Sequence, residues 1–168
     1  ISSAYRIIRK VGDGAASTVY EVQNRRGHQL ALKVYNHEAA KYASLDANVL
    51  HKLSHPNIVK LYDFDGDGFE KRPWMLLEWA PINLEERLIE EGRVSSINGL
   101  KKDGMAFLDA LKYIHESGIL HKDLKAKNIL FDPQNVLKIT DFNVAQEEVN
   151  GKKKGKKVFH VNIGQPDL

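Results

Sequence analysis

The chain of 168 residues is long enough for one large domain or two small lobes with a hydrophobic core, and its composition is that of an ordinary globular protein. The net charge of +3 does not indicate a nucleic-acid-binding face, because five lysines lie in GKKKGKK (151–157) and the rest of the chain carries −2. The lack of cysteine excludes disulfides and cysteine-bound metal centres and fits a reducing compartment such as the cytoplasm, while no apolar run approaches the roughly 20 residues that span a bilayer.

The first eighty or so residues are predicted to form a mostly antiparallel sheet with one helix. Runs rich in β-branched and aromatic residues predict strands over 5–11, 17–23, 30–35, 57–64 and 74–79. The segment NRRGHQ (24–29) is typical of a hairpin turn. A helix is predicted over 38–53, because apolar residues recur at intervals of three and four from Tyr42 to Leu53.

The second half is predicted to be mainly helical. Asn83 followed by Glu86 is a capping-box pattern, and it predicts a helix that stops at Gly92. A longer helix is predicted to run to Ser117, just before Gly118. Its apolar face contains Leu100, Met105, Leu108, Leu111 and Ile114. Short strands over 129–131 and 136–140, joined by DPQN, are predicted to form a hairpin.

Two features of the first half indicate possible phosphate chemistry. Gly12 and Gly14 lie between two strands, which argues against the dinucleotide fingerprint because that motif needs a helix next. The glycines can form either a plain tight turn or a hairpin whose N–H groups approach phosphates. Lys33 shares a strand face with Ala31 among apolar neighbours, so it needs either a carboxylate partner or a ligand phosphate.

A polar cluster is predicted near the second hairpin. Asp123, Lys125 and Asn128 precede its first strand, and Asp141 ends its second strand. Pairing of the two strands brings Asn128 and Asp141 to the same edge, where oxygen ligands with a nearby carboxylate favour a Mg²⁺ and phosphate site. A polar hairpin rim is the alternative.

Taken together and in this order, the glycine-rich hairpin, the strand lysine, HKDLKAKN (121–128) and DFN (141–143) resemble the eukaryotic-type protein kinase catalytic domain, serine/threonine branch. The resemblance implies an α+β, bilobal fold with an N-lobe of five antiparallel strands and one helix (1–78), a hinge (79–83), and a mostly helical, incomplete C-lobe (84–168). It also implies transfer of the γ-phosphate of ATP, with Mg²⁺, to a protein hydroxyl. Neither a nucleic acid nor a membrane is expected as a partner.

The resemblance also implies roles for single residues. Asp123 would accept the proton of the substrate hydroxyl, Lys125 would neutralise the γ-phosphate, and Asn128 and Asp141 would bind Mg²⁺. Lys33 would hold the α- and β-phosphates. The expected nucleotide-binding residues are Val11, Gly12, Gly14, Val19, Ala31, Lys33, Leu77, Glu78, Ala80 and Leu130. Of these, Leu77 is at the gatekeeper position, and Glu78 and Ala80 would offer backbone groups to adenine. His121 is expected to pack on Phe142, with Leu50 and Leu61, rather than to act as a base.

The chain departs from the family pattern at three positions. Asp46 stands where the family has a helix glutamate, so an ion pair with Lys33 would require a closer helix or a water. Asn143 replaces a glycine valued for its freedom in φ, and Asn is among the few other residues that tolerate positive φ. Lys122 replaces an arginine and loses its bidentate geometry, so we expect weaker dependence on activation-loop phosphorylation.

Asp46 and Asn143 leave a second interpretation open, a pseudokinase that acts as a nucleotide-binding scaffold. A small-molecule phosphotransferase is a third interpretation, against which Lys125 and HPNIV (55–59) argue. Residues 146–168 resemble the start of an activation segment, in which GKKKGKK would be an exposed loop. Because GQPDL (164–168) is similar to the segment before the family's Ala-Pro-Glu motif, we expect a fragment of a longer protein.

Overall fold

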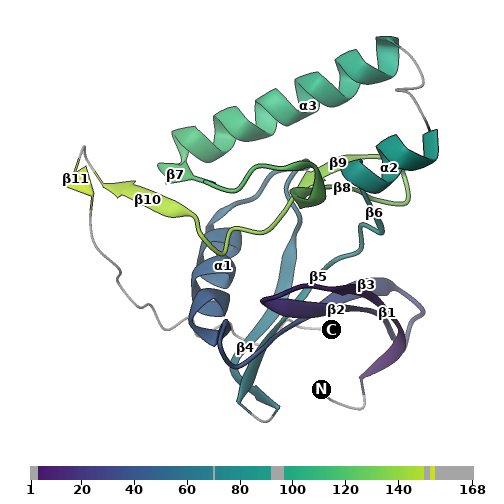
Figure 1. The fold of residues 1–168 in the computed structure, drawn as a ribbon, viewed down its shortest axis with the longest axis vertical. Helices are drawn as coiled ribbons and strands as arrows, with labels where there is room; N and C mark the ends of the chain where they lie inside the picture. The colour runs from purple at the N-terminus through teal and green to yellow at the C-terminus, as the bar shows by residue number, and fades with distance from the viewer. Residues whose placement is uncertain (1–3, 70, 92–96, 150–151, 154–168) are drawn as a thin grey trace.

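The computed structural model of the chain describes residues 4–69, 71–91, 97–149 and 152–153. One lobe consists of a sheet with a helix on it, and the other contains two helices and several short strands (Figure 1). None of the helices in these described ranges combines the length and the apolar character that crossing a membrane requires.

The first lobe is built on a five-stranded antiparallel sheet with the order β1-β2-β3-β5-β4. Its strands are β1 (Tyr5–Asp13), β2 (Ser17–Asn24), β3 (Gln29–Tyr35), β4 (Leu61–Phe69) and β5 (Arg72–Glu78). The prediction of an antiparallel sheet with one helix is confirmed. Residues 57–60 are not part of β4, however, because Ile58 forms an isolated parallel bridge with Ile139 of the other lobe.

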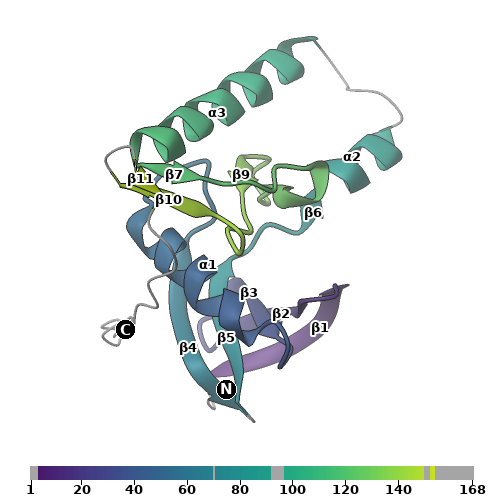
Figure 2. The same ribbon diagram turned by 60° about the vertical axis from the view of Figure 1, so that its left-hand side comes forward.

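Helix α1 (Ala40–Lys52) packs on one face of this sheet, next to β4 and β5 (Figure 2). Ala39, Ala43 and Ala47 recur every four residues and are almost entirely buried. Small side chains at a packing face let a helix axis lie close to its neighbour. The alanines therefore allow α1 to approach the sheet closely. The opposite face of the sheet holds a separate cluster around Val22, Leu32 and Leu76.

The second lobe begins with β6 (Ile82–Asn83) and α2 (Leu84–Glu91). The predicted capping box is confirmed, because the Glu86 amide donates to Asn83 Oδ1 at 2.9 Å and the Asn83 amide donates to Glu86 Oε2 at 3.0 Å. Gly92, where we expected the helix to stop, lies outside the described residues.

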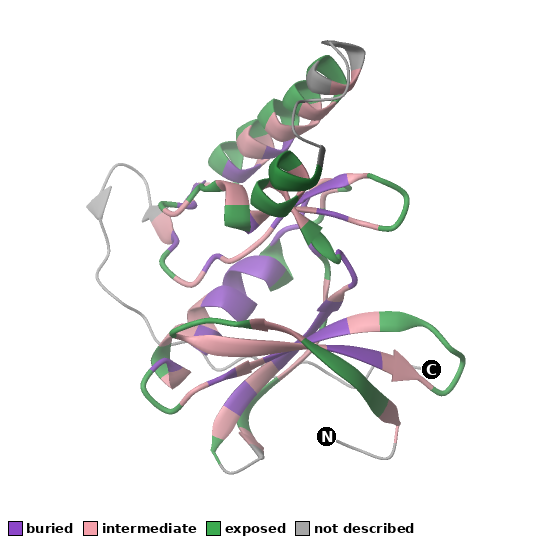
Figure 3. Cartoon of the chain, turned by 45° about the vertical axis from the view of Figure 1, so that its right-hand side comes forward, coloured by how far each residue is buried: buried purple, intermediate pink, exposed green. Residues whose placement is uncertain are grey.

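Helix α3 (Ile97–Glu116) ends as predicted near Gly118, whose φ of 71° suits a helix C-terminus. The predicted apolar face is only partly correct. Ile114 is fully buried, whereas Met105 and Leu108 are exposed by 68% and 58%. The reason is that α3 makes its contacts with β7 and β9 near its C-terminal end and extends beyond the rest of the lobe (Figures 1 and 3).

Short strands complete the second lobe: β7 (Ile119–Leu120), the 3₁₀ turn η1 (Ala126–Asn128), β8 (Ile129–Phe131), β9 (Leu137–Ile139), β10 (Gln146–Val149) and β11 (Lys152–Lys153). The predicted β8–β9 hairpin is confirmed, and β6 joins it. β10 pairs with β7 and β11, pairings that we did not predict. Two lysines of GKKKGKK thus belong to a strand rather than to a loop, and the rest of that segment and GQPDL lie outside the described residues.

One hydrophobic core connects the two lobes. It joins buried residues of the sheet and α1, such as Met75 and Leu50, to Ile114, Ile139 and Phe142 of the second lobe. Figure 3 shows this burial concentrated on α1 and the strands beside it, while α2 is mostly exposed. The segments that carry the polar cluster are therefore attached to a common interior.

Candidate active site

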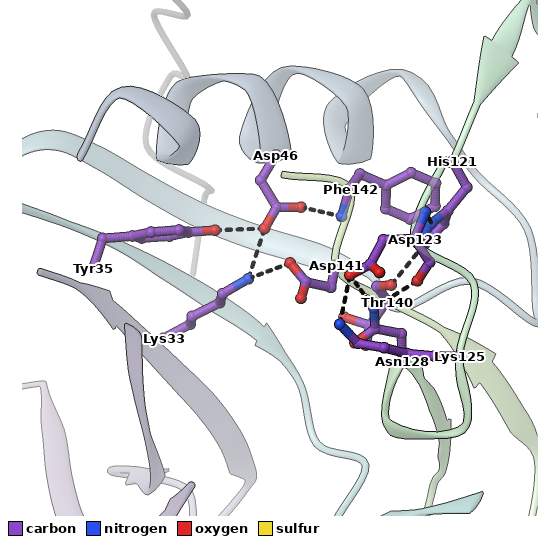
Figure 4. Close-up of polar contacts among 10 residues, drawn as sticks. All are labelled: Lys33, Tyr35, Asp46, His121, Asp123, Lys125, Asn128, Thr140, Asp141 and Phe142. Atoms are coloured by element: carbon purple, nitrogen blue, oxygen red, sulfur yellow. Dashed lines mark hydrogen bonds and ion pairs between the residues drawn. The ribbon is translucent and has the colours of Figure 1, made fainter. Parts of the chain in front are cut away.

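Lys33 lies in the centre of the sheet, on β3, between Val19 of β2 and Met75 of β5. Its side chain is nearly buried and its ammonium group contacts two carboxylates, Asp46 Oδ2 at 2.8 Å and Asp141 Oδ1 at 3.0 Å (Figure 4). A buried ammonium group requires such partners, because removal from water is costly. Lys33 therefore connects helix α1 to the segment that follows β9.

Asp46 of α1 is fully buried and accepts hydrogen bonds from Lys33 Nζ, the Tyr35 hydroxyl and the Phe142 backbone amide. The ion pair with Lys33 is direct, so the shorter carboxylate needs no bridging water. The alanines on the buried face of α1 give a physical reason for this, since they let the helix lie close to β3 and its neighbours. Sequence reasoning missed Tyr35, although its place two residues after Lys33 puts both side chains on one strand face.

The charges at this site reinforce one another. Burial by itself lowers the pKa of Lys33. The charge of Asp46, followed by the effects of Tyr35 and Asp141, outweighs burial, so the pKa of Lys33 lies well above its ordinary value. Burial, and then the Asp46 charge, raise the pKa of Tyr35 well above its ordinary value. Lys33 is therefore a cation and Tyr35 a neutral hydrogen-bond donor throughout the neutral range.

Asp123, Lys125 and Asn128 come together in the loop between β7 and β8. Lys125 Nζ donates to Asp123 Oδ2 at 2.7 Å, and Asn128 Nδ2 donates to the Asp123 carbonyl at 2.8 Å and to its Oδ2 at 3.1 Å. The hydrogen bond from Lys125 lowers the pKa of Asp123, whereas the smaller effect of burial raises it. Asp123 is thus a half-buried, ionised carboxylate with a fixed orientation.

The segment after β9 places Asp141 beside this loop. The Thr140 amide donates to the Asn128 carbonyl at 3.1 Å, which confirms that the hairpin brings Asn128 and Asp141 to one edge. Figure 4 draws Asp141 between Lys33 on one side and Asp123 with Asn128 on the other. The polar groups of both lobes therefore form one cluster.

The backbone at Asp141 has a φ of 68°, in the left-handed region. Asn143, which replaces the family's glycine, does not have a positive φ among the described residues. The positive φ that we considered for Asn143 thus occurs at Asp141, two positions earlier. Phe142 is fully buried, and its ring packs on His121 with centroids 4.5 Å apart, as predicted. The His121 Nε2 atom lies 2.9 Å from the Thr140 carbonyl, which fits a structural role.

Several residues that we expected to contact the nucleotide gather around the centre of the sheet. Gly12 is opposite Val19, and Ala31 is opposite Leu77. Val11, Val19 and Leu130 are partly buried against the same core that contains Ala31 and Leu77. Gly14 lies in the turn between β1 and β2, where its amide donates to the Ser17 carbonyl at 2.9 Å. That bond belongs to a tight turn and uses one of the N–H groups that a phosphate could have contacted.

Glu78 is the last residue of β5, and Ala80 lies two residues beyond it. The Glu78 amide donates to the Lys60 carbonyl at 2.9 Å, so the carbonyl is the group that Glu78 could offer to adenine. The Glu78 carboxylate instead binds Lys138 Nζ of β9 at 2.6 Å. This ion pair, which sequence reasoning missed, connects the end of the sheet to the β8–β9 hairpin. Ala80 is buried, with 9% of its surface exposed.

The donor set fits a magnesium ion. Asn128 uses its amide nitrogen on Asp123, which leaves Oδ1 as a ligand, and Asp141 uses Oδ1 on Lys33, which leaves Oδ2. Magnesium prefers one or two protein oxygens together with substrate phosphates and water. Asn128 and Asp141 supply such oxygens, and Lys33 and Lys125 supply the positive charges that phosphates attract.

A family model described as the protein kinase domain matches residues 5–165. The chain belongs to the protein kinase family. One similar protein is a serine/threonine-protein kinase, PKH3, from Eremothecium gossypii, with 32% identity over 146 residues that cover 81% of this chain and 20% of that protein. Another is a probable serine/threonine-protein kinase, CA_C1728, from Clostridium acetobutylicum, with 26% identity over 153 residues that cover 87% of this chain and 23% of that protein. The chain thus spans about a fifth of the length of these relatives.

The kinase match explains the order of the motifs and draws attention to two contacts that β10 makes with the rest of the chain. Lys122, in place of the family's arginine, has a φ of 69° and approaches Gln146 Oε1 of β10 at 3.4 Å. Lys52 at the end of α1 binds Glu147 of β10. Both contacts join the start of the expected activation segment to the kinase core. Sequence reasoning missed them because they join residues that are 24 and 95 positions apart.

Proposed function

We propose that this chain is the ATP-binding part of a serine/threonine protein kinase that transfers the γ-phosphate of Mg-ATP to a protein hydroxyl. The observation that carries the proposal is the direct contact of Lys33 with both Asp46 and Asp141. Lys33 thus already makes the ion pair with the helix carboxylate that phosphoryl transfer by the family requires, and it also contacts the proposed metal-ligating carboxylate.

Each polar residue then has a role in positioning or in charge stabilisation. Lys33 holds the α- and β-phosphates, while Asn128 and Asp141 hold Mg²⁺, which neutralises charge on the phosphates. The oxygen of the substrate hydroxyl bonds to the γ-phosphorus, and Asp123 accepts the proton that this hydroxyl loses. The bond from that phosphorus to the β-phosphate oxygen breaks, and ADP leaves. Lys125 neutralises the transferred group.

We propose that residues 1–78 form the N-lobe, 79–83 the hinge and 84–168 the part of the C-lobe in this chain.

The nucleotide is proposed to bind to the residues that gather around the centre of the sheet. The proposed nucleotide-contacting residues are Val11, Gly12, Gly14, Val19, Ala31, Lys33, Leu77, Glu78, Ala80 and Leu130. The gathering of Val19, Ala31, Leu77 and Leu130 around one core supports this assignment.

The scaffold alternative rested on Asp46 and Asn143. Asp46 makes the ion pair directly, and Asn143 does not have the positive φ for which the family's glycine is valued. The comparisons give this alternative no support either, since the two similar proteins named above are described as a serine/threonine-protein kinase and a probable one. We therefore propose the enzyme rather than the scaffold.

The acceptor class can be tested on the full-length protein. We expect phosphate from labelled Mg-ATP to appear on serine and threonine of a degenerate peptide library, and not on tyrosine, because a lysine two residues after the base resembles the serine/threonine branch. Phosphate found mainly on tyrosine would contradict the acceptor class. Phosphate found on no peptide and on no protein hydroxyl would contradict the function.

A further inference from the structure

Tyr35 is a fully buried side chain to which the mechanism above gives no role. Strand alternation puts it on the same face of β3 as Lys33, toward α1. Its hydroxyl reaches Asp46 Oδ2, and Lys33 Nζ lies 4.9 Å from the centroid of its ring. A tyrosine buried so completely usually directs its hydroxyl to a partner, and here the partner is the carboxylate that orients Lys33.

Tyr35 and Lys33 share one oxygen of Asp46. Oδ2 accepts from both side chains, while Oδ1 accepts from the Phe142 amide at 2.9 Å. An ionised carboxylate offers about four lone-pair sites, so these donors nearly satisfy it. Because Asp46 is fully buried, no water shell holds the carboxylate in place of these donors. Its orientation therefore depends on Tyr35 as well as on Lys33 and Phe142.

The length of the side chain at position 46 makes this dependence specific. The kinase family has a glutamate here, and Asp46 is one methylene shorter. A glutamate on the same helix turn would carry its carboxylate farther toward β3, where the Tyr35 hydroxyl already lies. Well-packed interiors do not accept an added methylene without displacement. The hydroxyl of Tyr35 thus occupies the space that the shorter acid leaves.

We propose that Tyr35 is a positioning residue for phosphate transfer, whose hydroxyl holds the Asp46 carboxylate where it orients Lys33, so that Tyr35 and Asp46 form a matched pair. This inference rests on the proposed function. It concerns residues 35 and 46 together. Tyr35 leaves no room for a glutamate at position 46, and Asp46 loses a hydrogen bond when position 35 is phenylalanine.

The test is a double-mutant cycle in the full-length protein, with Tyr35→Phe, Asp46→Glu and both together. We expect Tyr35→Phe to lower kcat/KM for ATP by roughly tenfold, the effect of one hydrogen bond to a buried charge. Asp46→Glu alone should also lower it, although it restores the family's residue, because the longer acid meets the hydroxyl. The double variant should recover most of the activity, since removing the hydroxyl makes room for the longer side chain.

Tyr20→Phe is the matched control, since Tyr20 lies on the opposite face of the same sheet and should leave kcat/KM unchanged. All proteins are measured well below their unfolding temperatures, so that a loss of stability alone does not change the rate. Additive losses, or an unchanged rate in Tyr35→Phe, would overturn the role of Tyr35 while the wild-type protein still transfers phosphate. No transfer by the wild-type protein would instead contradict the proposed function itself.

Discussion

Lys125 and Asp123 show at the scale of single residues how a local contact prepares a carboxylate for its proposed role as the base. A base must be ionised to accept a proton, and the hydrogen bond from Lys125 lowers the pKa of Asp123 from its ordinary value of 3.8. The carboxylate thus stays ionised as the pH falls below that value. The same contact fixes the direction in which its oxygens point.

Replacing Lys125 by alanine should therefore raise the pKa of Asp123 toward its ordinary value. A ¹³C NMR titration of the Asp123 carboxyl group should show its midpoint at a higher pH in the variant, and the acid limb of kcat/KM should move in the same direction. Lys127→Ala is a matched control, because Lys127 lies in the same loop but pairs with Glu85 at 3.4 Å. A midpoint that stays or moves to lower pH in Lys125→Ala would contradict this account.

At this scale the sequence predicted the polar residues themselves, because their types and order are written directly in the chain. It did not predict the partners of Asp46. Tyr35, Lys33 and the Phe142 amide meet Asp46 only after β3, α1 and the segment beyond β9 have packed together. Whether a shorter acid reaches a lysine depends on the approach of a helix to a sheet, and no local pattern encodes that approach.

The β4–β5 hairpin shows at the scale of elements how one glycine permits a strand pairing. Gly68 has a φ of 40°, and a Cβ atom built there would lie 1.8 Å from the Arg72 carbonyl oxygen. Gly66, two residues earlier, would meet only the Phe64 ring at 3.5 Å, which is an ordinary contact. The hairpin therefore depends on glycine at position 68 and tolerates alanine at position 66.

Gly68→Ala should lower the free energy of unfolding by roughly 1–3 kcal/mol, because both the backbone angle and the contact with Arg72 become strained. Gly66→Ala should change it by less than about 0.5 kcal/mol. Denaturant unfolding of the two variants and the wild-type protein measures the difference. Equal stability of the two variants would show that the hairpin does not need the conformation at Gly68.

Most elements could be predicted from the sequence, because their signals are local. Strand composition indicated all five strands of the sheet, and Asn83 with Glu86 indicated the start of α2. The pairing of β10 with β7 could not be predicted in this way, since it joins segments far apart in the chain. The exposure of Met105 and Leu108 could not be predicted either, because periodicity indicates an apolar face but not which part of that face a neighbour covers.

The whole molecule is held together by contacts that cross between its lobes. Lys33 of the sheet binds Asp141, Asp46 of α1 binds the Phe142 amide, and Glu78 binds Lys138. Two of these groups, Lys33 and Asp141, are the ones proposed to bind the phosphates and the metal. A nucleotide that contacts Lys33 and a metal held by Asp141 should therefore stabilise both lobes at once.

Mg-ATP should raise the unfolding temperature of the protein. At a concentration 100 times Kd, binding adds about 2.7 kcal/mol, which corresponds to a shift of roughly 5–10 °C for a chain of this size. Chelating Mg²⁺ should remove most of this shift. The Lys33→Ala variant should also show a much smaller shift on adding Mg-ATP than the wild-type protein does, whatever its own unfolding temperature without the nucleotide. A shift of equal size without Mg²⁺, or in the Lys33→Ala variant, would contradict the proposed mode of binding.

We propose that Asp123, Lys33, Asp46 and Asp141 together form an active phosphotransfer site. The most direct test is the rate of γ-phosphate transfer from Mg-ATP under single-turnover conditions by the full-length protein, beside its Asp123→Asn variant. Asparagine keeps the shape of Asp123 but cannot accept the proton, so we expect transfer by the wild-type protein and a rate lower by about 10²-fold or more in the variant. Equal rates in the two proteins, with Mg-ATP bound to both, would contradict the account.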